Sequence, residues 1–469
     1  MHEPAMVKDL DGYLDVLAQL PLLNIYTQIS LCFLVPDASS HAAIIETLTS
    51  GLERLSASFP WLAGQVVNEG SGEGNSGTFK IKTLGEVPPL VVKDLRHDPS
   101  MPTMDALRQA NFPFRMLDEN IIAPRNTLRG SPNESAPDPK PVFLLQANFI
   151  TGGLLVTFVG QHNAMDMTGQ GQIIHLFSKA CRNEPFTSEE LSSGNLDRRS
   201  LIRLLDDSYK PGSELALQIV KPASVHPISN DTSSQPAAPP PPPKCTWTYI
   251  TFPPDSLAAL KSLATKTITL PSGYISTDDA LSAFIWQSVI RARLPRLGPI
   301  AESTLARAIN VRSYFGVPET YAGLMQNMTY HTSTLQNLAE EPLGSVASQL
   351  RSALDSKTSN LGHHTRSLAT FLDRTPDKST ISFAATLDLS ADLMLSSWAK
   401  LNCYELDFNL GLGKPESVRR PQFNAFESLV YLMPKALDGE IAVAICLRDG
   451  DMARLRADKE FSKYGKYIE

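Results

Sequence analysis

A run of five consecutive prolines, Pro239 to Pro243, divides the 469-residue chain close to its middle. Proline has no backbone N–H and its ring clashes with a preceding helical turn, so this run must be extended. A chain of this length is also too long for one compact core. The sequence therefore predicts two domains of similar size, 1–182 and 246–469, joined by a crossover, 183–245, that is rich in proline at its end.

The overall composition argues against several classes of protein. The net charge is −7 and no cluster of Lys and Arg is present, so we expect no binding of nucleic acid or of an anionic membrane. The five cysteines are scattered without a C-x-x-C pair, which is typical of a reducing compartment. The first residues carry acids where a secretory signal is basic. These features predict a cytoplasmic protein, with a monomer as the default.

An uncharged stretch over residues 16–36 is long enough to raise the question of a membrane span. Pro21 and Asn24 interrupt it. We expect instead the end of an amphipathic helix, a turn near Pro21 and a strand over 25–34.

Both halves mix predicted strands with predicted helices, and the spacing of apolar residues distinguishes the two. The glycine-rich residues 72–77 fit G-x-G-x-x-G but lead into an alternating strand pattern, so they predict a hairpin turn rather than a dinucleotide site. The further predicted strands are 141–149, 153–160 and 440–447, and the predicted helices are 40–59, 167–182, 255–267, 277–293 and 450–463.

A histidine and an aspartate, His162 and Asp166, stand between the strand predicted at 153–160 and the helix predicted at 167–182. This position can hold an imidazole rigidly and leave one ring nitrogen facing a cavity. A neutral imidazole has a pKa of about 6.5 and can accept a hydroxyl proton near neutral pH. The plainer interpretation of the pair alone is a buried histidine that satisfies a loop carbonyl.

A metal site is a second alternative for the same pair. The facial triad of non-haem iron enzymes requires a histidine and a carboxylate two residues apart, which this spacing does not supply. His175, the other candidate ligand, falls in the apolar register of the following helix. We therefore predict no metal.

A second polar segment, Asp407 to Pro415, follows the strand-like residues Ser396 to Trp398. Its glycines permit turns with positive φ, and Asn409 tolerates the left-handed region. Taken alone, this segment is typical of a surface loop.

Taken together, the histidine motif of the first half and the Asp-Phe-x-x-Gly loop of the second half resemble the BAHD acyltransferases. Residues 276–286 resemble the helix-opening motif of that family, and Asn310-Val311-Arg312 resembles its Asn-x-Arg strand. Longer segments resemble the fungal trichothecene 3-O-acetyltransferases within the family; they are 25–31, 118–125, 178–187, 327–331, 395–400 and 410–421.

The resemblance implies an α/β fold of the chloramphenicol acetyltransferase type. Two similar-sized domains would each contain a mixed β-sheet flanked by helices, and an active-site channel would lie between them. His162 matches the family's general base, Asp166 its structural aspartate, and Arg312 the arginine that pairs with that aspartate. Ser396 and Trp398 match positions near the acyl carbonyl.

The resemblance also implies that Asp407, Gly411 and Gly413 belong to a distal loop with a structural role. The sequence departs from the family's Asp-Phe-Gly-Trp-Gly at this loop, because Asn409 and Leu410 replace Gly and Trp. Asparagine can keep the backbone shape, so we expect no loss of activity.

The function implied is transfer of an acetyl group from acetyl-CoA, as co-substrate, to a secondary hydroxyl, the C3 hydroxyl of a trichothecene-type sesquiterpenoid. The reaction would proceed in a ternary complex without an acyl-enzyme and without a metal. The alternatives are a family member that uses another alcohol or acyl donor, and a non-catalytic protein that binds small molecules on the same scaffold.

Overall fold

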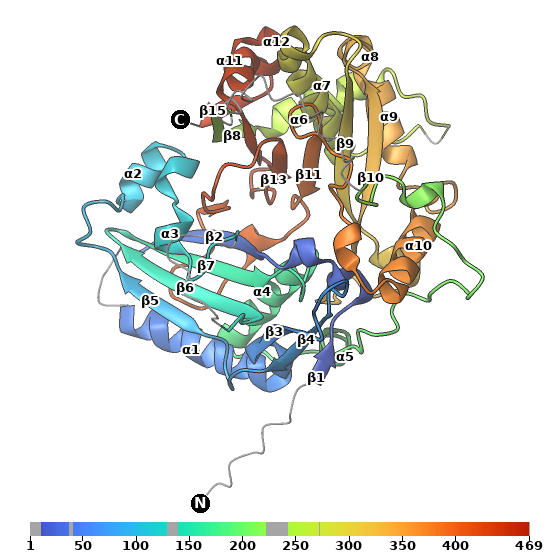
Figure 1. Cartoon of the computed structure of the whole chain (residues 1–469). Helices are drawn as coiled ribbons and strands as arrows, with labels where there is room; N and C mark the ends of the chain where they lie inside the picture. The colour runs from blue at the N-terminus through green and yellow to red at the C-terminus, as the bar shows by residue number, and fades with distance from the viewer. Residues whose placement is uncertain (1–10, 37–40, 129–138, 222–242, 272, 469) are drawn as a thin grey trace, which may run out of the picture.

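The computed structural model describes residues 11–36, 41–128, 139–221, 243–271 and 273–468. Most of the proline run at 239–243 lies outside these ranges. Two mixed β-sheets, one in each half of the chain, are flanked by helices and face one another across the middle of the molecule (Figure 1). This arrangement confirms the predicted α/β fold with two halves.

The sheet of the first half has five strands in the order β12 (Ser417–Arg419), β2 (Tyr26–Leu34), β7 (Gly153–Gln161), β6 (Phe143–Ile150), β5 (Leu90–Asp94). Side chains alternate between its faces, as the period of a strand requires. Val156 and Phe158 of β7 pack in the layer that contains helices α1 (His41–Ser58) and α4 (Met167–Cys181). Leu155 packs on the opposite face with helix α2 (Met104–Gln109).

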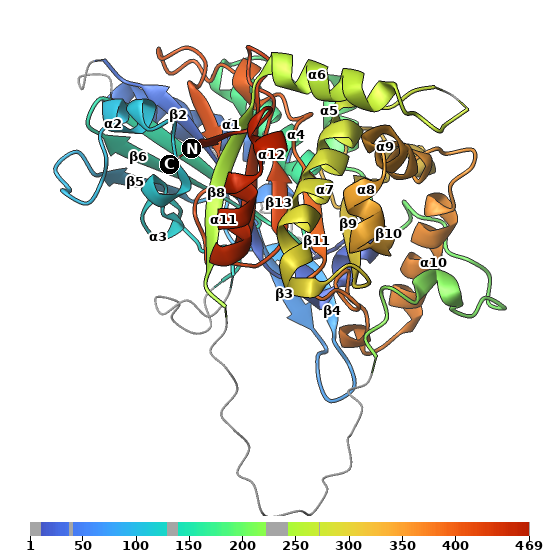
Figure 2. The same ribbon diagram turned by 90° about the horizontal axis from the view of Figure 1, so that it is seen from above.

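The sheet of the second half has seven strands in the order β10 (Gln326–Thr334), β9 (Glu302–Asn310), β11 (Leu393–Ser397), β13 (Leu429–Leu432), β14 (Ile441–Arg448), β8 (Cys245–Phe252), β15 (Lys466–Ile468). One face packs on helices, which lie over the strands in Figure 2. They are α6 (Pro254–Thr265), α7 (Thr277–Leu297), α8 (Leu335–Glu340), α9 (Leu343–Ser352), α11 (Asp449–Ala457) and α12 (Lys459–Ser462).

The other face of this second sheet is directed at the first half. Along β14, Val443 and Ile445 belong to the helix-covered core, whereas Ala444 and Cys446 belong to the core that contains the first half. The same alternation along β11 places Met394 with the first half and Leu395 with the helices. The two halves therefore share one continuous apolar layer.

A segment of the second half also crosses into the first. Strand β12 pairs antiparallel with β2, with Val418 opposite Leu31. Phe408 lies in an aromatic cluster of the first half, with its ring centroid 5.8 Å from those of both Phe158 and Phe177. These contacts join the halves by backbone hydrogen bonds as well as by apolar packing.

A small three-stranded sheet contains β1 (Asp11–Tyr13), β4 (Thr78–Thr83) and β3 (Gly64–Glu69). Strands β3 and β4 are antiparallel neighbours, and the glycine-rich residues 72–77 connect them. The predicted hairpin turn is therefore confirmed. The remaining helices are α3 (Glu119–Ile122), α5 (Ser188–Gly194) and α10 (Leu361–Arg374).

One predicted helix, at 450–463, is wrong in its continuity. The structure has two helices there, α11 and α12, separated at Asp458. The Asp458 carboxylate accepts hydrogen bonds from the N–H groups of Glu460 and Phe461 and so begins a new helix.

Among all the helices of the described ranges, none combines the length and apolar character that a membrane span requires.

Candidate active site

His162 directly follows β7, on the turn that leads into α4. Its backbone N–H donates to the carbonyl of Ile25, 2.9 Å away, at the start of β2. Its ring nitrogen Nδ1 lies 3.0 Å from the carbonyl oxygen of Met165. The side chain is only partly buried, so the ring is held from one side by its own turn.

The contact with Met165 determines which ring nitrogen carries the proton. A carbonyl oxygen can only accept a hydrogen bond, so Nδ1 must be the protonated nitrogen. In the neutral ring Nε2 is then the nitrogen with a free lone pair. No residue in the described ranges forms a hydrogen bond with Nε2. Burial lowers the pKa of His162 below its ordinary value of 6.5, although the Met165 carbonyl and Asp166 oppose this shift. The turn therefore presents a neutral imidazole whose Nε2 lone pair is available to accept a proton.

Asp166 does not contact the imidazole in this arrangement. Its carboxylate caps α4 by accepting a hydrogen bond from the N–H of Gly169 at 2.8 Å. It also accepts from the N–H of Met325 at 2.8 Å and pairs with both terminal nitrogens of Arg312 at 2.9 and 3.0 Å. Asp166 thus fixes the end of the turn that begins at His162.

Arg312 lies just after β9 and is fully buried. Each of its five N–H donors has an acceptor. The acceptors are the two carboxylate oxygens of Asp166, Asn310 Oδ1 and the carbonyl oxygens of Tyr321 and Gly323. Burial by itself would lower the Arg312 pKa, but the carboxylates of Asp166 and Asp15 raise it above its usual value. The predicted pairing of Asp166 with Arg312 is therefore present as a bidentate buried ion pair between the halves.

Ser396 and Trp398 lie at the end of β11 in the second half. The indole N–H of Trp398 donates to Ser396 Oγ at 3.1 Å, and the Trp398 side chain is buried. Because this bond occupies the indole donor, the Ser396 hydroxyl hydrogen is the one that remains to donate. Ser396 follows Leu395 in the alternation along β11, which directs it toward the first half.

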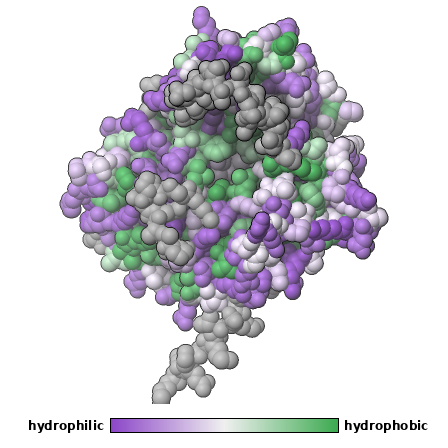
Figure 3. All heavy atoms as spheres, in the orientation of Figure 1, coloured by the Kyte–Doolittle hydropathy of each residue, from purple (hydrophilic) through white to green (hydrophobic). Residues whose placement is uncertain are grey.

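A buried arginine, Arg420, connects the surroundings of His162 with those of Ser396. Its charge lies close enough to His162 to lower the pKa of the imidazole further. Its guanidinium stacks over the ring of Tyr431, 5.1 Å from the centroid, and that ring lies 5.0 Å from Trp398. Tyr431 is in turn the β13 neighbour of Ser396. The predicted residues of the two halves therefore border one region. In Figure 3, apolar residues gather near the middle of the molecule, between the halves.

The loop that contains Asp407 holds the halves together at a different place. Asn409, Gly411 and Gly413 all have positive φ, at 54°, 73° and 70°. A Cβ atom on either glycine would meet open space, so the backbone conformation and not crowding favours glycine there. The Asp407 side chain accepts from the N–H of Asn409 at 2.8 Å, and the Asp407 backbone carbonyl accepts from the guanidinium of Arg182, the residue that follows α4. These contacts shape the loop that inserts Phe408 into the first half.

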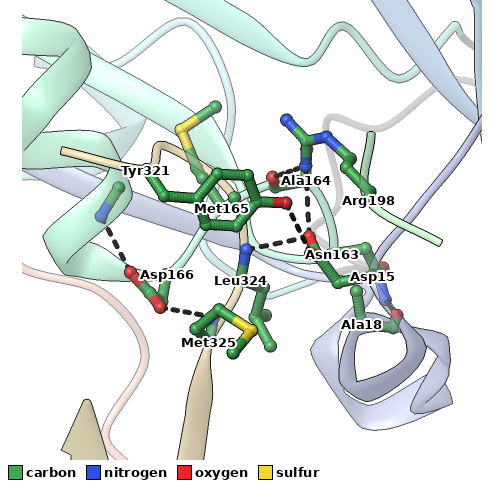
Figure 4. A network of polar contacts seen from close by, with 12 residues as sticks. Asp15, Ala18, Asn163, Ala164, Met165, Asp166, Arg198, Tyr321, Leu324 and Met325 are labelled. Atoms are coloured by element: carbon green, nitrogen blue, oxygen red, sulfur yellow. Dashed lines mark hydrogen bonds and ion pairs between the residues drawn. The ribbon is translucent and has the colours of Figure 1, made fainter. Parts of the chain in front are cut away.

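A network of three further residues reaches the turn at His162 through Arg198, which donates to the Ala164 carbonyl, and sequence reasoning did not single these residues out. Asp15, Arg198 and Tyr321 form a buried network beside residues 163–166 (Figure 4). No local pattern marks them, because Asp15 and Tyr321 lie 306 positions apart in the sequence.

A metal site was the alternative that the sequence did not favour, and His175 was its further candidate ligand. His175 lies on α4, where its ring nitrogen is 3.8 Å from Glu190 of α5. Within the ranges that the structure describes, no group of three or more His, Cys, Asp or Glu side chains is arranged to hold a metal ion.

Comparison with known proteins shows similarity along nearly the whole chain. The model of the Transferase family matches residues 127–462, and that of the Trichothecene 3-O-acetyltransferase-like N-terminal domain matches residues 25–181. O-acetyltransferase dmxR13 of Cryptosporiopsis sp. is 64% identical, with 98% of each chain covered. Trichothecene 3-O-acetyltransferase TRI101 of Fusarium sporotrichioides is 54% identical, also with 98% of each chain covered.

Among solved structures, the crystal structure of F. sporotrichioides TRI101 complexed with coenzyme A and T-2 superimposes with a TM-score of 0.91 at 53% sequence identity. The superposition covers 98% of this chain and 100% of that one. The order of elements and the arrangement of the two halves are therefore those of the similar enzyme.

Proposed function

The chain belongs to the Transferase family, the BAHD acyl-CoA-dependent O-acyltransferases, and we propose that it acetylates the C3 hydroxyl of a trichothecene-type sesquiterpenoid with acetyl-CoA as the donor. Two observations support this acceptor and donor. A relative that is 54% identical is named as a trichothecene 3-O-acetyltransferase, and the similar crystal structure contains coenzyme A and T-2.

In the proposed reaction, Nε2 of His162 removes the proton of the acceptor hydroxyl as the oxygen attacks the acetyl carbonyl carbon. A tetrahedral oxyanion forms and collapses, the carbon–sulfur bond breaks, and the CoA thiolate takes a proton from the imidazolium to leave as CoA thiol. The ring returns to its neutral form, so no acyl-enzyme is formed. Holding both substrates together in a channel between the halves supplies part of the rate by proximity.

In this scheme the Ser396 hydroxyl donates a hydrogen bond to the oxyanion. The bond from the Trp398 indole at 3.1 Å fixes the hydroxyl oxygen and leaves its hydrogen directed elsewhere. Loss of one such donor typically costs about 3–4 kcal/mol of transition-state stabilisation. Arg312 and Asp166 act at a distance by holding the turn, and Asp407, Gly411 and Gly413 act on the loop that joins the halves.

The single observation that carries the catalytic assignment is the contact from Nδ1 of His162 to the Met165 carbonyl. It places the proton on Nδ1 and leaves the Nε2 lone pair for a substrate. A base prepared in this way needs no further proton transfer before it can act.

The direct test is incubation of the purified protein with acetyl-CoA and a trichothecene alcohol such as T-2, with a thiol probe for released CoA. We expect CoA release that requires the alcohol, and a product heavier by one acetyl group in mass spectrometry, acetylated at C3 by NMR. Incubation without alcohol is the control for simple thioester hydrolysis. Absence of acceptor-dependent release across a panel of alcohols would favour a non-catalytic binding protein.

A second acceptor class has its own support, because a relative that is 64% identical is named only as an O-acetyltransferase. Acceptor-dependent CoA release with other secondary alcohols but not with trichothecenes would favour this alternative. The donor and the role of His162 would remain as proposed.

The pH dependence of the reaction follows from the state of His162. The neutral ring is the active form of a base, and burial favours that form by lowering the pKa below 6.5. We therefore expect kcat/KM for the acceptor to be flat through neutral pH and to fall only as the pH drops below about 6.5. A profile of log(kcat/KM) against pH measures this. A loss of activity that already begins above pH 7, and that persists when His162 is replaced, would contradict the prediction.

A further inference from the structure

The carboxylate of Asp15 is buried at the junction of the two halves, just before the short 3₁₀ helix η1 (Val16–Gln19). It accepts hydrogen bonds from the Tyr321 hydroxyl at 2.5 Å and from the backbone N–H of Leu324 at 3.0 Å. It also pairs with Arg198 Nη1 at 3.3 Å (Figure 4). A carboxylate buried with so many donors fixes the positions of all of them.

Arg198 carries this constraint to the turn that contains His162. The same nitrogen that pairs with Asp15, Nη1, donates to the carbonyl of Ala164 at 2.6 Å. The guanidinium is stacked over the ring of Trp61, 4.4 Å from the centroid, which limits its freedom to move. Removal of the Asp15 carboxyl group would leave Arg198, the donor to the Ala164 carbonyl, without this partner.

The Ala164 carbonyl belongs to the peptide group next to the one that orients His162. The Ala164 carbonyl and the N–H of Met165 share one peptide plane, and the Met165 carbonyl that binds Nδ1 belongs to the following plane. Only the two dihedrals of Met165 separate these planes. A constraint on the Ala164 carbonyl is therefore a constraint on the acceptor that sets the tautomer of His162.

Asp15 and Asp166 act on the same segment of the second half. Asp15 accepts from the N–H of Leu324, and Asp166 accepts from the N–H of the next residue, Met325. Two buried carboxylates of the first half thus hold consecutive amides of the second. Asp166 stands at the end of the turn 162–166, and Asp15 reaches the middle of that turn through Arg198 and the Ala164 carbonyl.

We propose that Asp15 is a positioning residue for His162, which acts through Arg198 and the Ala164 carbonyl to hold the Met165 carbonyl on Nδ1. This inference rests on the proposed function of His162 as the base. Asp15 itself contacts no reacting atom. Its removal is expected to lower the rate by misplacing the base, and not by removing a catalytic group.

The test compares Asp15→Asn with Asp451→Asn in the full-length protein. Asp451 is a matched control, because it is also a fully buried carboxylate paired with arginines, Arg293 at 3.4 Å and Arg296 at 2.8 Å. It lies on α11, on the helix-covered face of the second sheet, and takes no part in the network of Asp15. Both variants replace a buried carboxyl group that pairs with arginine, so a general loss of stability affects both.

We expect Asp15→Asn to lower kcat by about 10- to 100-fold with KM values for both substrates unchanged, the size of effect that a misplacement of about 1 Å can have. Asp451→Asn should lower the melting temperature and leave kcat of the folded enzyme unchanged. In a second pair, Arg198→Lys keeps an ammonium that can contact both acceptors and should retain more activity than Arg198→Met.

A second readout does not depend on activity. In ¹⁵N-histidine NMR of the full chain, with the His162 signals assigned by their loss in His162→Gln, the wild-type ring should have its proton on Nδ1. Asp15→Asn should add the tautomer with the proton on Nε2, and Asp451→Asn should not. An unchanged tautomer together with an unchanged kcat in Asp15→Asn overturns the inference. If the tautomer responds but no acetyl transfer is found in any variant, the positioning role stands and the proposed function fails.

Discussion

Replacement of His162 by alanine is expected to lower kcat by about 10²- to 10⁴-fold, the usual contribution of a general base, while the fold is retained. The side chain is only partly buried, and within the described ranges its single hydrogen bond is the one to the Met165 carbonyl. Loss of one such bond typically costs about 1 kcal/mol, a small part of the free energy of unfolding. Steady-state kinetics with acetyl-CoA and a trichothecene alcohol measure the rate, and circular dichroism on heating measures the fold.

The matched control for this prediction is His175→Ala. His175 is a residue of α4, the helix that follows the turn at 162–166. Its ring lies near Glu190 and does not take part in that turn. We expect wild-type kcat and KM from this variant. If His162→Ala turned over acceptor at the wild-type rate, the role of base would have to be assigned to another group.

The elements around His162 could be predicted from the sequence because each is encoded in a few consecutive residues. The apolar run that begins at Gly153 forms β7, and the helical spacing that begins at Met167 forms α4, at the positions expected. The two halves followed from the proline run and from the resemblance to a family. The pairing of Arg312 with Asp166 also came from that resemblance, since nothing in the local sequence connects residues 146 positions apart.

Other parts of the site depend on which distant segments meet, and no local pattern encodes this. In the sequence, Asp15 is only one of several acids near the start of the chain, and its contacts with Tyr321 and Leu324 depend on the second half lying against it. Strand β12 has three residues, too few for an alternating pattern, so its crossing to pair with β2 was not predicted. The break between α11 and α12 was missed because the capping Asp458 stands in a run of charged residues.

Removal of one partner of the Asp166–Arg312 pair is expected to prevent stable folding. In Arg312→Ala, the Asp166 carboxylate keeps only the N–H groups of Gly169 and Met325, and it remains a buried charge without a counter-ion. Breaking a buried pair in this way typically costs about 3–5 kcal/mol, a large share of the 5–15 kcal/mol that stabilises a typical folded domain. The expected result is a sharp loss of soluble protein or a melting temperature many degrees lower, measured by differential scanning fluorimetry on the soluble fraction.

Two comparisons separate this effect from the simple loss of an ion pair. Arg199→Ala breaks the exposed pair with Asp197 and should change the melting temperature little, since solvent screens charges at the surface. In the double variant Asp166→Leu with Arg312→Met, no unpaired charge remains, so part of the lost stability should return. If Arg312→Ala were as stable as Arg199→Ala, the pair could not be what holds residues 162–166 against the second half. If the double variant recovers its stability but not its kcat, the pair is needed to place the turn as well as to fold the protein. Apolar side chains can fill the space of Asp166 and Arg312, but they cannot bind the N–H of Met325 or the carbonyl of Gly323.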